Sequence, residues 1–81
     1  MIDYESAVPV YRQVAAILEE RIAAGTYQPG KRLPSVRDLV QEFGIAQLTG
    51  RKALRVLVDE GLAEMSPGMG TYVKKPPKEV S

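Results

Sequence analysis

One stretch of the chain carries side chains that could recognise base pairs. It is FGIAQLTGRKALRVL, residues 43 to 57. A glutamine amide can form two hydrogen bonds with adenine, an arginine guanidinium can do the same with guanine, and an apolar side chain can pack on the methyl group of thymine. The stretch offers all three, with further polar groups, at Gln47, Leu48, Thr49, Arg51 and Lys52. We expect these residues to contact DNA, although a single exposed leucine is common and needs no function.

Charge is unevenly distributed along the chain. The net charge is only +1, yet residues 31 to 58 hold two anions, Asp38 and Glu42, against six cations: Lys31, Arg32, Arg37, Arg51, Lys52 and Arg55. A basic middle segment predicts a polyanionic partner better than the overall charge does. Among these cations we expect Arg37 to reach a backbone phosphate. Lys31, Arg32, Lys74 and Lys75 could add phosphate contacts, but solvated surface charge is the simpler interpretation for each.

Composition argues against catalytic and metal chemistry. The chain has 81 residues, which is one small domain with one core, and it contains neither cysteine nor histidine. Thiolate metal sites and the usual general base are therefore excluded, and we expect no cofactor and no metal. The acidic pairs Glu19-Glu20 and Asp59-Glu60 join sequence neighbours that point in different directions from a helix. An enzyme is the weakest of the function classes considered.

No segment resembles a membrane span or a signal peptide. No apolar run approaches the roughly 20 residues that a bilayer requires. The first ten residues, MIDYESAVPV, lack the basic and apolar blocks of a secretory signal. We expect a soluble, cytoplasmic protein with no membrane partner.

Two helices are predicted in the first half of the chain. The first has Pro9 in its first turn and Gly25 just after its end, with an apolar stripe formed by Tyr11, Val14, Ala15, Leu18 and Ile22. Pro29-Gly30 is typical of a type II turn, and Leu33 should point inward. The second helix begins at the N-cap Ser35, with Asp38 completing a capping box, and Gly44 ends it. Its stripe is Val36, Leu39, Val40 and Phe43.

A third helix should run from about Gln47 to Glu60, closed by Gly61. The turn between the second and third helices is short and contains glycine, and two helices joined in this way are typical of a helix-turn-helix. The inward stripe of the third helix is Gly50, Ala53, Leu54 and Leu57. We expect Gly50 to let the second helix approach closely, so that an added methyl group would overpack the contact or at least cancel the gain in helix propensity. The alternative is that the glycine is a tolerated defect.

The remaining sequence predicts a β-hairpin, or wing, after the third helix. Leu62 to Met65 and Thr71 to Val73 are two short strand-like runs, and SPGMG between them has the composition of a turn. The predicted fold is mainly α with this small hairpin, a winged helix-turn-helix of three helices plus the wing. We expect one domain over residues 1–75 and a flexible tail or linker over residues 76–81.

The ordered set of motifs resembles the winged-helix DNA-binding domain of GntR-family bacterial transcriptional regulators. The resemblance covers about residues 8 to 74. It is carried by YRQV in the first helix, by G-x-Y-x-P-G-x-x-LPS-x-R-x-L, by FG, by R-x-AL-x-x-L-x-x-EGL and by G-x-GT-Y-V. The resemblance implies that Arg37 touches phosphate and that Arg51 contacts a base. It also implies that the wing tip, here Gly68, Met69 and Gly70, enters the minor groove.

This chain departs from the family pattern at several of these positions. Ala46 and Gln47 stand where the family tends to have a hydroxyl residue and then arginine, Leu48 replaces a hydroxyl residue, and Gly50 replaces a β-branched one. The wing tip, often basic, is Met69. These departures predict a less basic and more apolar reading surface. The larger effector-binding domain usual in the family is also absent, so the chain is either a small regulator or the DNA-binding part of a longer one.

These observations predict a transcriptional regulator, a repressor that binds a double-stranded DNA operator as a homodimer. The dimer rests on the resemblance and on the small footprint of one helix. The alternative is a protein-interaction module that uses the exposed surface around Leu48 and Met69. A salt-dependent affinity for DNA would separate the two hypotheses.

Overall fold

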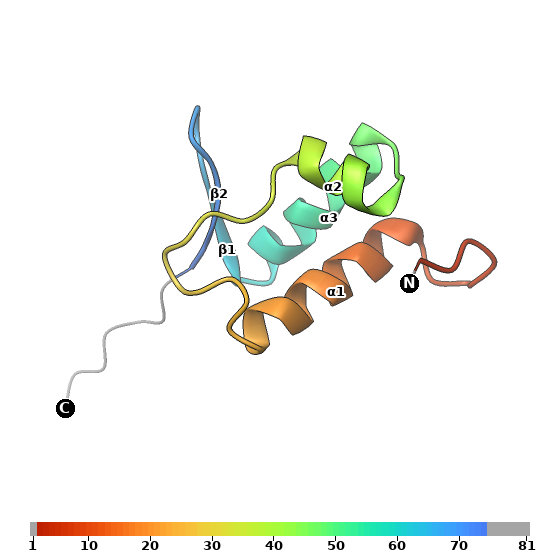
Figure 1. Cartoon of the computed structure of the whole chain (residues 1–81), viewed down its shortest axis with the longest axis horizontal. Coiled ribbons are helices and arrows are strands. Elements are labelled where there is room, and N and C mark those ends of the chain that lie inside the picture. The colour runs from red at the N-terminus through yellow and green to blue at the C-terminus, as the bar shows by residue number, and fades with distance from the viewer. Residues whose placement is uncertain (1, 75–81) are drawn as a thin grey trace.

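Three helices and a hairpin form where the local sequence signals begin and end them. The computed structural model describes residues 2–74; Lys75 and the predicted tail at residues 76–81 lie outside these residues. The elements are α1 (Val10–Ala23), α2 (Val36–Phe43), α3 (Gln47–Asp59), β1 (Ala63–Ser66) and β2 (Gly70–Val73). Figure 1 shows α1 alongside α3, α2 at one end of α3 and the hairpin at the other. The predicted winged helix-turn-helix is confirmed.

The start of α2 is fixed by two reciprocal hydrogen bonds. The Ser35 hydroxyl accepts from the backbone N–H of Asp38 at 3.1 Å, and the Asp38 carboxylate accepts from the backbone N–H of Ser35 at 3.0 Å. These hydrogen bonds, the backbone one first, hold the pKa of Asp38 below its usual value. At the other end Gly44 has φ 65° and its N–H donates to the carbonyl of Val40. The predicted capping box and glycine stop are confirmed.

The ends of α1 are also defined by local signals, with one difference from prediction. Pro9 was expected inside the first turn but lies one position earlier, as the N-cap, with ψ 147°. Its carbonyl accepts from the N–H of Arg12 at 3.0 Å and of Gln13 at 3.2 Å. Proline suits either position, because neither requires an N–H group. Gly25, with φ 82°, follows the helix end as predicted.

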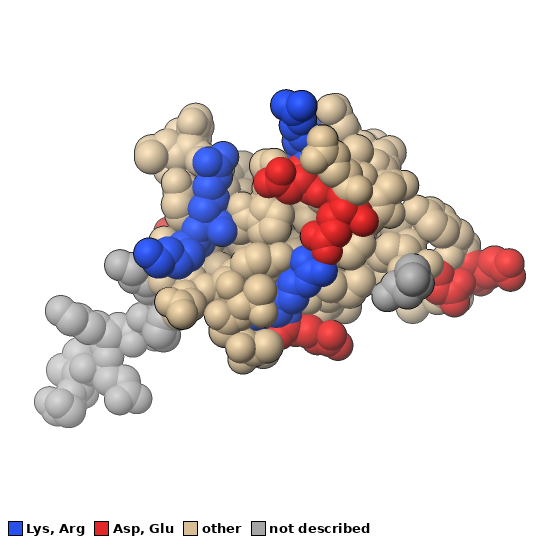
Figure 2. Space-filling view, viewed as in Figure 1, with Lys and Arg blue, Asp and Glu red and all other residues tan. Residues whose placement is uncertain are grey.

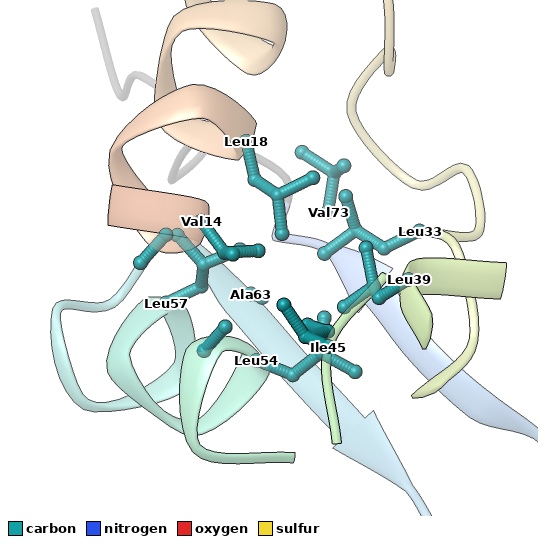
Figure 3. Packing of buried hydrophobic residues seen from close by; sticks show 11 residues of the cluster. Val14, Leu18, Leu33, Leu39, Ile45, Leu54, Leu57, Ala63 and Val73 are labelled. Carbon is teal, nitrogen blue, oxygen red and sulfur yellow. The ribbon is translucent and has the colours of Figure 1, made fainter. Parts of the chain in front are cut away.

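The core gathers side chains from every element around α3. Figure 3 shows them pointing into one space between α1, α3 and the strands. The buried residues are Val14, Ala15, Leu18, Leu33, Leu39, Ile45, Ala53, Leu54, Leu57, Ala63 and Val73. Most predicted inward residues belong to this set, and Gly50 is buried as well. The flanking members of the predicted stripes are only partly buried: Tyr11, Ile22, Val36, Val40 and Phe43.

The wing is the predicted two-stranded antiparallel hairpin, but its first strand begins and ends one residue later than predicted and its second strand begins one residue earlier. Ala63 pairs with Val73 and Ser66 with Gly70, so Leu62 lies outside β1 while Ser66 and Gly70 belong to the strands. Leu62 is excluded because its N–H donates to the carbonyl of Leu57 at 2.9 Å, which completes the end of α3. The turn is therefore shorter than SPGMG.

A third extended segment lies along β2. The N–H of Gly30 donates to the carbonyl of Val73 at 2.8 Å, and the N–H of Val73 donates to the carbonyl of Lys31 at 2.9 Å. Further along, the N–H of Leu33 donates to the carbonyl of Thr71 at 2.8 Å, and Leu33 is buried. The wing is thus tied to the loop between α1 and α2. The sequence did not predict this pairing.

Gly50 faces α2, but the contact has room for a methyl group. A Cβ built on Gly50 would lie 3.4 Å from Cγ1 of Val36 and 3.7 Å from Cδ1 of Ile45. These are ordinary van der Waals distances. The close approach of the second helix is confirmed, whereas the expectation that one methyl group would overpack it is not supported.

We therefore expect Gly50→Ala to stabilise the protein by up to about 1 kcal/mol, because alanine gains helix propensity without a clash. Urea unfolding of the two proteins measures the difference. Gly44→Ala is the matched control. Its φ of 65° disfavours any side chain, so that variant should lose about 1–2 kcal/mol. A destabilised Gly50→Ala protein would show that α2 cannot accept the methyl group.

Two carboxyl groups meet where α1 passes the end of α3. The side chain of Glu60 beside Glu19 is the largest cause of a raised pKa of Glu19, and burial and charge repulsion raise it further, against a smaller opposing effect of Arg12. A raised folded-state pKa means that the folded protein holds the proton more tightly than the unfolded chain. This contribution to stability is complete below the usual value of 4.5 and is lost as pH rises through the raised pKa.

Glu60→Gln should therefore raise the melting temperature at pH 7, where two carboxylates repel, and leave it nearly unchanged at pH 4. Thermal melts at the two pH values test this. Glu20→Gln removes the same charge from an exposed neighbouring position of α1 and should show no such pH dependence. Equal shifts in the two variants would mean that only net charge matters.

Candidate nucleic-acid interface

The first half of α3 turns most of its polar and cationic side chains outward. Burial of the stripe from Gly50 to Leu57 fixes the rotation of the helix. As a result Gln47, Leu48, Arg51 and Lys52 are exposed, and Leu48 retains 59% of its surface. Thr49 is half-buried. Four of the five predicted residues of this helix thus lie fully on the outer surface.

The N-terminus of α3 has open backbone donors. Ala46 is the N-cap and makes no side-chain hydrogen bond to the first turn, and that turn contains no acidic residue. A helix N-terminus carries partial positive charge on such N–H groups. This end of α3 therefore favours an anionic partner, in keeping with the cations that follow it.

A groove of about 380 Å³ separates α3 from the wing. Arg51 and Leu54 of α3 form one wall, and residues 65 to 71 of the wing form the other. Arg32, Ser35 and Val36 complete it. The predicted residues Arg51, Gly68, Met69 and Gly70 meet around this groove, although they come from separate parts of the sequence.

The predicted cation Lys52 lies on the other edge of α3. Its Nζ is 5.7 Å from the centroid of the Tyr11 ring, and Cζ of Arg12 lies at the same distance from that ring. A cation over an aromatic face is held there by the ring quadrupole. Lys52 is thus drawn toward α1, and Arg51 faces the wing. The two neighbouring cations therefore lie on different sides of α3.

The other cations divide according to whether they have an acidic partner. Arg21 forms an ion pair with Glu42 and donates a hydrogen bond to the Tyr27 hydroxyl, and these contacts raise its pKa. Arg55 pairs with Asp59 at 3.1 Å within α3. Within residues 2–74, no salt bridge engages Arg32, Arg37 or Arg51. These three exposed arginines lie on the loop before α2, the first turn of α2 and α3.

Figure 2 shows the charge on the face that α2 covers. Acidic side chains gather over the middle of this face with one basic side chain directly below them, and further basic side chains lie beside the wing and at the upper edge of the molecule. The acidic residues of α2 are Asp38 and Glu42, and Glu42 is neutralised by Arg21. The positive charge that remains available lies toward the wing and the ends of the helices.

The tip of the wing is apolar and sharply turned. Gly68 has φ 76° and the N–H of Met69 donates to the carbonyl of Ser66 at 3.0 Å, which defines a type II turn with Pro67 at its second position. Met69 retains 61% of its surface. Residues 63 to 73 contain one charged side chain, Glu64, and no cation.

The sequence alone does not place Arg32 in this groove. It predicts that Arg32 is solvated surface charge or a further phosphate contact, whereas in the structure Arg32 lines the groove and its guanidinium lies against Gly70. The signal was its position one residue before the inward Leu33, which turns Arg32 outward in an extended segment. That signal has meaning only when the pairing of this segment with β2 is known.

Residues 2–74 hold no cluster of three or more acidic, cysteine or histidine side chains that could bind a metal ion. No helix within that range combines the length and the apolar character needed to cross a membrane.

Comparison with known proteins gives consistent matches. Residues 10–73 match the family model described as "Bacterial regulatory proteins, gntR family". The HTH-type transcriptional repressor NagR of Bacillus subtilis (strain 168) is 42% identical over 78 residues, which cover 96% of this chain and 32% of NagR. The chain spans about a third of the length of the curated relatives it matches.

Solved structures share the fold. YtrA from Sulfolobus acidocaldarius, a GntR-family transcription factor, superposes with a TM-score of 0.85 at 39% identity, over 98% of this chain and 67% of YtrA. AraR(DBD), whose structure is a complex with operator ORR3, superposes with a TM-score of 0.79 at 34% identity, over 90% of this chain and 88% of that one.

Proposed function

The chain belongs to the GntR family of bacterial regulatory proteins, and from this premise we propose that it binds double-stranded DNA as the reading domain of a transcriptional regulator. The observation that carries the proposal is the exposed first half of α3 beside the wing. In a helix-turn-helix the second helix of the motif enters the major groove with its N-terminal residues toward the base edges. Here that helix is α3.

The proposed contacts follow from the position of each side chain. Gln47 and Arg51 can form bidentate hydrogen bonds with adenine and guanine, and Leu48 can pack on a thymine methyl group. Thr49, being half-buried, is limited to contacts along one side of the helix. Arg37 lies at the start of α2 and Lys52 lies over Tyr11, and we propose that both bind phosphates on the flanks of the site. The wing tip at Gly68, Met69 and Gly70 then enters the minor groove.

We further propose that the protein is a repressor and acts as a homodimer in the cytoplasm. NagR is named as a repressor, and AraR(DBD) is seen with an operator. One recognition helix covers a short site, and dimers of such domains read two half-sites about one helical turn apart. The alternative, a protein-interaction module that uses Leu48 and Met69, is less favoured because both residues lie where a DNA reader needs apolar contacts.

The isolated domain should bind duplex DNA in a salt-dependent manner. If five phosphates are neutralised, the logarithm of the association constant should fall with the logarithm of salt concentration at a slope of about −4.5. Fluorescence anisotropy with a pool of labelled duplexes, repeated at several salt concentrations, measures this slope. A flat response, or no binding at low salt, would reject the DNA proposal in favour of a protein partner.

Arg51 and Arg37 should differ in what they contribute. Arg51→Ala should cost about 1–3 kcal/mol on the preferred duplex and relax the choice of one base pair, since a base contact carries sequence information. Arg37→Ala should weaken binding to all duplexes about equally and reduce the salt slope by about one. Selection of bound duplexes from a random pool, followed by titration of each variant, compares them. If Arg37→Ala changed the preferred sequence, the assignment of Arg37 to the backbone would be wrong.

A further inference from the structure

The wing of this protein has no cation of its own, and a residue from a distant part of the chain lies where one would be useful. We propose that Arg32 is the phosphate-binding cation of the wing. We further propose that its guanidinium is positioned by the space left by the absent side chain of Gly70, which we call the seat. The proposal rests on the DNA-binding function proposed above. It gives Gly70 a positioning role in addition to its proposed place in the wing tip.

Pairing with β2 holds the backbone of Arg32 in place. The segment is anchored on both sides of Arg32 by the hydrogen bonds of Gly30, Lys31 and Leu33 to β2, and Arg32 itself is opposite Tyr72 in an antiparallel bridge. Leu33 is buried, with 2% of its surface exposed. The Cα of Arg32 is therefore fixed relative to the wing, although it lies 38 positions before Gly70 in the sequence.

The guanidinium group occupies the space that a side chain at Gly70 would fill. A Cβ built on Gly70 would lie 2.8 Å from Nε of Arg32 and 3.2 Å from its Cζ and Nη2. In an antiparallel sheet, a long side chain reaches the diagonal neighbour two residues from its direct partner. Gly70 is that neighbour of Arg32, because Tyr72 is the direct partner. Any side chain at position 70 would displace the guanidinium.

The seated guanidinium borders the groove between α3 and the wing, where Arg51 lies on the other wall. If α3 enters the major groove and the wing enters the adjacent minor groove, the sugar-phosphate backbone that separates those grooves must pass across this opening. A cation here meets phosphate and not base edges. Arg32 forms no salt bridge with any carboxylate of residues 2–74, although it attracts the Asp38 carboxylate at longer range. Guanidinium also matches the geometry of phosphate oxygens.

The first experiment compares Arg32→Ala with Lys31→Ala. Both variants remove one positive charge from adjacent exposed positions, but successive side chains of an extended segment point to opposite faces, so only Arg32 shares a face with Gly70. Arg32→Ala should reduce the salt slope by about one and weaken binding about five- to tenfold at 0.1 M salt, equally for all duplexes. Lys31→Ala should bind as the unmodified protein does.

The second experiment tests the seat with Gly70→Ala in two backgrounds. Gly70 has φ 121°, so alanine strains the backbone whether or not Arg32 is present. Any effect of that strain on DNA affinity appears in both backgrounds, whereas loss of the seat appears only when Arg32 is present. We expect Gly70→Ala to weaken binding severalfold more in the Arg32 protein than in Arg32→Ala. Without DNA, the amide resonance of Gly70 should shift in Arg32→Ala and not in Lys31→Ala.

The outcomes separate this proposal from the DNA-binding proposal. If the unmodified protein binds no duplex at low salt, the DNA-binding function fails and this inference fails with it. If the protein binds and Arg32→Ala behaves like Lys31→Ala, only the assignment of Arg32 is overturned. Equal losses from Gly70→Ala in both backgrounds would overturn the seat and leave Gly70 only its proposed place in the wing tip.

Discussion

Burial of one face of α3 is the constraint on which the other features depend. The stripe from Gly50 to Leu57 contacts α1, α2 and β1 at once, so α3 cannot rotate without exposing apolar surface to water. With a period of 3.6 residues, fixing that stripe also fixes which side chains face out. The exposure of Gln47, Leu48 and Arg51 is thus a direct consequence of the core. The exposed surface of α3 is held rigid by the packing on the opposite side of the same helix.

Signals that act over a few residues were predictable from the sequence. The capping box of Ser35 and Asp38, the glycine ends of the helices and the turn at Gly30 are local, and the structure has each of them. Predictions failed where a neighbouring element competed for the same residue. Leu62 has the composition of a strand residue, but its N–H completes the end of α3. The space around Gly50 also depends on the exact approach of α2, which no periodicity gives.

Contacts between distant segments could not be predicted from the sequence, for a different reason. Nothing in the neighbourhood of Arg32 indicates that its side chain lies against Gly70, because the contact requires pairing between the loop before α2 and β2. In the same way, the separation of Lys52 from Arg51 depends on Tyr11 in α1. The exposed residues of α3 and of the wing tip were thus identifiable from the sequence, whereas the way in which the fold groups them was not.

This grouping bears on how a nearly neutral chain can attract a polyanion. Two arginines are neutralised by carboxylates, Arg21 by Glu42 and Arg55 by Asp59, and these pairs add little field at the surface. The arginines without such partners in residues 2–74 surround α3 and its groove, so the positive potential is local. A phosphate backbone supplies much of the affinity in protein–DNA complexes. A chain with few free cations therefore gains most from each one that is positioned before binding, because a preorganised side chain loses less entropy on contact. The wing itself has only Glu64 as a charged residue. In the proposal above, Arg32 of the loop before α2 supplies the cation that makes the apolar tip compatible with a charged duplex.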